Sequence, residues 1–146
     1  MCSTAVTVIT TIATTIIGGM VGYFSARRIS NLNTRQLAAA KFRAGIIYEL
    51  TGFYPVDHYW EEKDFPRLYQ NMPRIKSMCA EFRYFVKSKD AFDTAVKNYD
   101  EYCRKTTYGE ISAYSMYPTM RKDGEIDPRE KFNNIVKHLL SFAERK

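Results

Sequence analysis

The residues best suited to bind a metal ion lie in one short segment. Asp57, His58, Glu61 and Glu62 bring an imidazole and three carboxylates together, and a His and a Glu four positions apart would share one face of a helix. The segment has no clear helical period, and His138 is the only other histidine of the chain. We therefore expect a solvated acidic corner, and we predict no metal ligand, cofactor or catalytic residue.

The cysteines are the candidate nucleophiles, but each would need a base placed against it. Cys79 and Cys103 fall on apolar helical stripes, so we expect both to be small core residues. Cys2 has no Leu-containing lipobox before it. Three cysteines without metal-ligand spacing fit a reducing compartment, and no glycine-rich phosphate loop is present. Catalysis would require a site assembled from distant residues, which stays open as an alternative.

The first 26 residues contain no charged side chain and are rich in Ile, Val and Met. About 20 such residues in a helix span the hydrocarbon core of a bilayer, so we predict one transmembrane helix over 1–26. A cleaved signal peptide would need a positive start and a small residue three positions before the cut. The start is uncharged, and Phe24 occupies that position for a cut after Ala26. A buried helix of a soluble protein is the remaining alternative.

Small and polar residues form one stripe along this predicted span. At about 100° per residue, they fall within roughly 80° of one another: Thr7, Thr11, Thr14, Gly18 and Gly22. The pair Gly18 and Gly22 would let two helix backbones approach closely in lipid. We therefore predict a homo-oligomer held through the span. The alternative is that the threonines bond only their own preceding turn.

Basic residues follow the span directly, and none precedes it. Arg27, Arg28 and Arg35 are predicted to contact anionic lipid of the bilayer. By the positive-inside rule, the N-terminus lies outside and the bulk of the chain faces the cytoplasm. The expected location is a bacterial inner membrane, with the protein crossing it once.

The net charge of +6 is unevenly distributed. Before Glu49 the chain has five basic residues and no acidic one, whereas from Glu49 onward it has 17 basic and 16 acidic residues. The excess therefore lies beside the predicted membrane helix, and the remainder is nearly neutral. A nucleic-acid-binding domain would carry the excess on its own face, so we predict no nucleic-acid partner.

The rest of the chain reads as helical, with no strand pattern. We predict an all-α fold with an anchor at 1–26, a basic neck at 27–34 and a cytoplasmic helical domain at 35–146, built as an antiparallel bundle of three to four helices. Ser30 to Thr34 either interrupts the first helix or is carried through it.

The expected helices follow from apolar spacing and from capping residues. The first has its apolar face at Leu37, Ala40, Ala44, Ile47 and Leu50, widened by Phe42 and Ile46, and ends at Gly52 and Pro55. Next come a connection over 55–64, a short turn from Asp64, a helix opened by Pro73 and capped by Asn71, a turn at 87–90, and a helix over 92–103. The last begins after Asp127 and Pro128. Half-buried Arg43 would need a partner such as Glu81 or a helix end. The alternative is that it contacts a ligand or a phospholipid headgroup.

Residues 106–126 show no sustained period, and we expect a long loop there. Its aromatic residues include Tyr108, Tyr114 and Tyr117, which are side chains of the kind that dominate protein interfaces. These tyrosines are candidate contacts for a cytoplasmic protein partner. The alternative is that they close over the core of their own domain.

Several packing motifs resemble an uncharacterised family of small bacterial proteins. They are Phe42-Arg43-Ala44, the run from Glu81-Phe82 to Phe85, Phe92 with Tyr99 and Tyr102, and the ending Leu139 to Ala143. The resemblance covers nearly the whole chain and implies an N-terminal membrane helix followed by a cytoplasmic helical domain. It implies no activity.

The function expected from these observations is that of a membrane-tethered noncatalytic interaction module. It would self-associate through the span and contact a cytoplasmic partner. The alternative is a membrane-associated enzyme, or a phage-type or toxin-type effector, acting near the inner leaflet.

Overall fold

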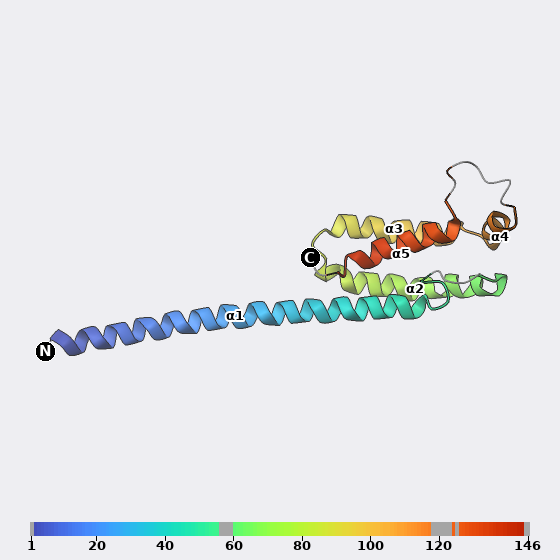
Figure 1. Ribbon diagram of the computed structural model, residues 1–146. Coiled ribbons are helices and arrows are strands. Elements are labelled where there is room, and N and C mark those ends of the chain that lie inside the picture. The colour runs from blue at the N-terminus through green and yellow to red at the C-terminus, as the bar shows by residue number, and fades with distance from the viewer. Residues whose placement is uncertain (1, 56–59, 118–123, 125, 145–146) are drawn as a thin grey trace. The chain divides into compact units, whose positions relative to one another are not determined.

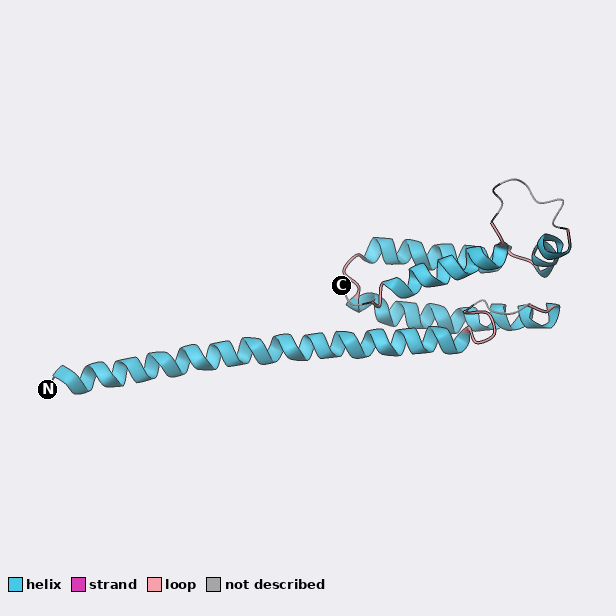
Figure 2. Ribbon diagram, in the orientation of Figure 1, coloured by secondary structure: helices cyan, strands magenta, loops and turns pink. Residues whose placement is uncertain are grey.

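The computed structural model describes the chain apart from residues 1, 56–59, 118–123, 125 and 145–146, and it describes side chains from Tyr23 onward, without Phe24. Every regular element among the described residues is helical, which confirms the all-α prediction. The chain divides into two compact units, Met1–Leu37 and Ala38–Lys146. Figures 1 and 2 show the helices in chain order.

Helix α1 is a single helix over Cys2–Glu49. Ser30 to Thr34 is carried through it, and the Thr34 hydroxyl donates to the Ser30 carbonyl at 2.9 Å. The side chains at 1–22 and 24, which make up most of the predicted span, lie outside the described residues. Among the side chains that the structure describes, no helix combines the length and apolarity needed to cross a membrane.

Within the second unit, α1 buries Phe42 and Ile46, and Leu50, in the turn directly after α1, is also buried. These three residues lie four positions apart and therefore share one helix face. The prediction that Leu37 and Ile47 belong to the buried face was wrong, because they are 73% and 39% exposed. The apolar arc is wider than the buried face, so apolar spacing alone did not identify which side packs on the core.

The end of α1 is formed as predicted. Gly52 has φ +91°, a left-handed conformation that closes helices and that L side chains rarely adopt. Arg67 donates to the Thr51 carbonyl, and its guanidinium lies 5.2 Å from the ring centroid of Phe53. The chain reverses here and leads into the connection before α2.

Helix α2 begins earlier than predicted. After a short 3-10 turn, η1 (Glu62–Asp64), it covers Phe65–Phe82. Pro66 occupies its first turn, where no backbone donor is needed, and Pro73 lies inside the helix. Asn71 does not cap it, because its amide donates to the Glu49 carbonyl at the end of α1 at 2.6 Å.

Two ion pairs link α3 to α2 and to the short turn that follows α2. The turn η2 (Arg83–Phe85) leads to α3 (Lys89–Lys105), which begins inside the predicted turn. Arg83 binds both carboxylate oxygens of Asp93 at 2.7 Å. Lys76 lies 2.8 Å from Asp100.

The predicted loop over 106–126 contains a helix, α4 (Tyr108–Met116). The Thr107 hydroxyl accepts from the Glu110 amide, and the Glu110 carboxylate accepts from the Thr107 amide, which is a capping box. Helix α5 (Pro128–Ser141) begins as predicted, with Asp127 accepting from the Arg129 amide at 2.8 Å.

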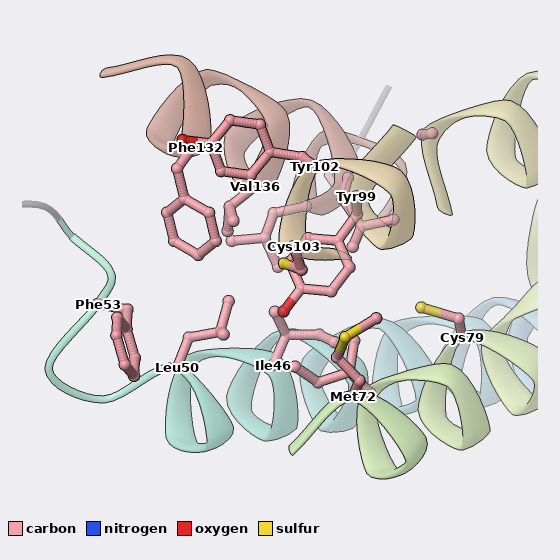
Figure 3. Packing of buried hydrophobic residues seen from close by; sticks show 14 of the residues in the cluster. Ile46, Leu50, Phe53, Met72, Cys79, Tyr99, Tyr102, Cys103, Phe132 and Val136 are labelled. Carbon is pink, nitrogen blue, oxygen red and sulfur yellow. The ribbon is translucent and has the colours of Figure 1, made fainter. Parts of the chain in front are cut away.

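The core of the second unit is strongly aromatic. Trp60, which lies in the predicted connection, is fully buried and makes edge-to-face contacts with Phe53, Phe65 and Phe132. Figure 3 shows the side chains of α3 and α5 converging on Ile46 and Leu50 of α1. Helix α3 packs against both α2 and α5, so the predicted helical bundle is present.

Phe42 tests whether α1 is fixed to the bundle by this packing. Its ring stacks on Phe82 at 4.4 Å and meets Phe92 edge to face. Phe42→Ala should lower the free energy of unfolding by about 3–5 kcal/mol, because it removes buried area and leaves a cavity. Tyr84→Ala, at a side chain 84% exposed, should cost within about 0.5 kcal/mol. Urea unfolding followed by circular dichroism measures both, and equal costs would contradict the packing described.

Candidate functional site

The candidate partner contacts on α4 differ in their exposure. Ile111 is fully buried and fixes the helix to the core. Tyr108 is half-buried, and its ring lies 5.8 Å from that of Phe65. Met116 and Tyr117, at the end of α4, are 62% and 54% exposed. Met116 and Tyr117 are therefore exposed at one end of a short helix that Ile111 anchors to the core.

Tyr114, the remaining predicted contact, is half-buried on α4. Residues 118–123 and 125 of the predicted loop lie outside the described residues. The signal that could have identified α4 is local: Thr107 followed three residues later by Glu110 is a standard helix start. The absence of a long apolar period concealed it.

The predicted lipid-contact residues lie on the described part of α1. Arg27 and Arg28 are exposed, and Arg35 is half-exposed. No ion pair to these three arginines occurs in the described part of the chain. They therefore have unneutralised charge available for an anionic surface. The stripe Thr7, Thr11, Thr14, Gly18 and Gly22 lies outside the side chains that the structure describes.

Arg43 pairs with a residue other than Glu81. Its guanidinium lies 3.4 Å from the carboxylate of Glu144, after the end of α5. Glu81 instead pairs with Lys41 at 3.2 Å. Arg43 therefore has a carboxylate partner, as predicted, but the partner is Glu144. Glu81 pairs with Lys41 instead, because Lys41 and Arg43 lie on different sides of α1.

The acidic corner is only partly described, since Asp57 and His58 lie outside the described residues. Glu61 pairs with Lys63 at 2.6 Å, and its amide donates to Asp64 at 3.0 Å. These contacts close a turn. No group of three or more His, Cys, Asp and Glu side chains that could hold a metal ion occurs among the described residues.

The two described thiols are buried, as predicted. Burial raises the pKa of Cys79 to about 12. Burial also raises the pKa of Cys103 to about 12, although a contact with the Tyr99 hydroxyl acts in the opposite direction. Both groups are protonated at neutral pH, and only a thiolate is an effective nucleophile.

The Tyr99 hydroxyl lies in the same environment. Burial, followed by the neighbouring Cys103, raises the pKa of Tyr99. Burial likewise raises the pKa of Tyr102 to about 12, and the Tyr102 hydroxyl donates to the Pro128 carbonyl. The Tyr102 hydroxyl therefore couples α3 to α5 in its protonated form.

A shallow hollow of about 300 Å³ lies between α3 and α5. Its floor is apolar, and its rim carries polar and basic groups; the lining residues are Ala95, Asn98, Ile126, Lys131, Asn134, Ile135 and His138. The ring of His138 packs against Phe142 at 5.4 Å. Sequence reasoning did not identify this hollow, because its residues come from two helices far apart in the chain.

Comparisons with protein-family models, with curated proteins and with solved structures find no match for this chain. The resemblance to small bacterial membrane-anchored proteins therefore stays a prediction.

The buried thiols and phenols predict an alkaline loss of stability. Their pKa values are higher in the folded than in the unfolded chain, so the folded state holds protons that the unfolded state releases. The free energy of unfolding should be level in the range just below pH 9, the ordinary thiol pKa, and should fall toward pH 12. Each such group contributes a slope of up to about 1.4 kcal/mol per pH unit.

Urea unfolding at a series of pH values measures this slope. Cys103→Ala should reduce it, because one of the shifted groups is removed. Ala91→Ser, at an exposed position of α3 without a titratable side chain, should leave the slope unchanged. A stability that does not fall between pH 9 and pH 12 would be inconsistent with protonated buried thiols.

Proposed function

We propose that this protein is a noncatalytic interaction module that its N-terminal helix tethers to a membrane, with the domain of residues 35–146 on the cytoplasmic side. The observation that carries the proposal is the placement of charge along α1. The chain has no charge through Ala26, and Arg27 and Arg28 follow at once. A long uncharged apolar helix partitions into hydrocarbon, and arginines after it are retained on the cytoplasmic side.

The arginines support the tether. Arg27 and Arg28 are exposed on α1, and each basic side chain near anionic lipid contributes on the order of 1 kcal/mol of binding. Together with Arg35 they would hold the helix end at the headgroups. The resemblance to a bacterial family supports the inner membrane of a bacterium as the location.

Self-association through the span is the second part of the proposal. The spacing of the threonines and glycines supports it, because at about 100° per residue Thr7, Thr11, Thr14, Gly18 and Gly22 would fall within roughly 80° of one another on a helix. Close backbone approach at Gly18 and Gly22 would give two copies van der Waals contact that lipid chains do not supply.

A cytoplasmic protein partner is the third part. Exposed Met116 and Tyr117 are of the side-chain types enriched at interfaces, and anchored α4 presents them with little loss of conformational freedom on binding. The protonated thiols Cys79 and Cys103 favour a binding role over nucleophilic chemistry.

Glycine substitutions test the span. Full-length chain in vesicles of phosphatidylethanolamine and phosphatidylglycerol should show energy transfer between donor-labelled and acceptor-labelled copies. Gly18→Ile and Gly22→Ile should each weaken association by about tenfold or more, because the added side chains separate the backbones. Gly19→Ile is the matched control, since Gly19 lies about 100° around the helix from Gly18.

The outcomes separate the parts of the proposal. Energy transfer that Gly19→Ile preserves and the other two variants lose supports a helix contact at the stripe. Equal behaviour of all three variants would show that the span does not associate through these glycines. If the chain does not insert into the vesicles, the proposed membrane tether is contradicted.

A further inference from the structure

The hollow between α3 and α5 takes no part in the function proposed above. One face of α5 lines it with four residues at the spacing i, i+3, i+4 and i+7: Lys131, Asn134, Ile135 and His138. Helix α3 contributes Ala95 and Asn98, and Ile126 lies before α5. Lys131 and His138 are about 10 Å apart along the helix axis. With a volume of about 300 Å³, the hollow has the size of a small-ligand pocket.

The polar side chains among the described residues that line the hollow are basic or neutral, and none is acidic. Lys131 supplies a positive charge, and Asn98 and Asn134 supply amide hydrogen-bond donors. Within the described part of the chain Lys131 forms no ion pair, whereas Lys97 and Lys105 of α3 both pair with Glu101. The charge of Lys131 is therefore available to an anion.

A packed aromatic ring limits where that charge lies. The Lys131 ammonium is 5.9 Å from the centroid of the Tyr102 ring, which is a cation–π distance. Tyr102 is itself buried, and its hydroxyl donates to the Pro128 carbonyl in the first turn of α5. Because both members of this contact belong to the packed pair α3 and α5, the ammonium is positioned near the start of α5 before any ligand binds.

The floor of the hollow is apolar surface that the described part of the domain leaves partly uncovered. Ala95 is buried, Ile135 is half-buried and Ile126 is 58% exposed. Covering such surface with an apolar group is favourable, because the surface is removed from water. The hollow therefore combines an apolar floor with one uncompensated positive charge.

From this arrangement we propose that the hollow binds a small organic acid, a monocarboxylate with an apolar body. The carboxylate contacts the Lys131 ammonium, and the apolar body covers Ile126 and Ile135. This binding function is separate from the membrane tether and from self-association, so its failure would leave both of those proposals standing.

The charge of the hollow favours a carboxylate over other ligand classes. A phosphate ester carries up to about two negative charges and is typically held by several basic groups, whereas one lysine lines this hollow. An amine would lie beside Lys131 and would be repelled by it. A neutral molecule of the same shape would gain the apolar contact and nothing from the charge.

Four probes that differ in one substituent on a benzene ring test the ligand class: benzoate, benzamide, benzylamine and phenyl phosphate. Full-length chain in phosphatidylcholine nanodiscs, with isotope-labelled isoleucine methyl groups, is titrated with each probe at neutral pH and followed by NMR. Benzoate should shift the methyl resonances of Ile126 and Ile135 saturably, with a dissociation constant on the order of 1 mM. Ile75, buried on α2, should not shift.

The other probes should bind more weakly than benzoate. Benzamide lacks the ion pair and benzylamine is repelled, so both should bind at least about fivefold more weakly. Phenyl phosphate should also bind more weakly, because its second charge loses water without gaining a partner. Empty nanodiscs measure how much of each probe enters the lipid.

A substitution at Lys131 gives an independent reading. Lys131→Gln removes the charge and keeps most of the side chain, so it should weaken benzoate binding about fivefold and leave benzamide binding unchanged. Lys137→Gln is the matched control, since Lys137 is an exposed lysine of the same helix that does not line the hollow. It should leave benzoate binding unchanged. Circular dichroism shows whether each variant keeps its helices.

Four results would overturn the inference. If benzoate causes no saturable shift at Ile126 and Ile135 at concentrations about tenfold above the expected constant, the hollow is not a binding site. If benzamide binds as well as benzoate, the charge has no role. If benzylamine or phenyl phosphate binds more tightly, the ligand class is wrong. If Lys131→Gln and Lys137→Gln weaken binding equally, benzoate responds only to the net charge of the domain.

Discussion

The burial of Phe42, Ile46 and Leu50 is the contact on which the rest of the structure depends. Because α1 continues without a break from Cys2 to Glu49, the helix that carries the uncharged N-terminal stretch is also a core element of the bundle. The ring of Phe42 contacts Phe82 and Phe92, which also contact each other, so one α1 residue packs against both α2 and α3. Loss of this face would leave α1 attached to the domain by the chain connection and by polar contacts such as Lys41–Glu81 and Arg43–Glu144.

The fold was largely predictable because most of its helices are locally encoded. Asp127 with Pro128 identified the start of α5, and Gly52 identified the end of α1. Two features were missed for physical reasons. Trp60 lies in a connection without helical period, so only its tertiary contacts with Phe53 and Phe132 reveal that it is buried. The apolar residues of α1 cover a wider arc than the face that packs on the core. Only the structure shows that Phe42 is buried and Leu37 is exposed.

The functional features were less predictable than the fold. The exposed arginines followed from charge distribution alone, since their placement needs no tertiary contact. The partners of Arg43 and Lys41 could not be read from the sequence, because each ion pair joins residues that are far apart in the chain. Together these features describe a helix with an uncharged N-terminal stretch, exposed arginines after it and a face buried in the core.

The most direct test of the account is to determine on which side of the membrane Cys2 and Ala91 lie. A membrane-impermeant maleimide applied to intact spheroplasts should label the native Cys2, with the signal lost in Cys2→Ser. In that variant background, Ala91→Cys should be labelled only after the inner membrane is opened. Labelling of Ala91→Cys in intact spheroplasts, or recovery of the chain in the soluble fraction, would contradict a tether with a cytoplasmic domain.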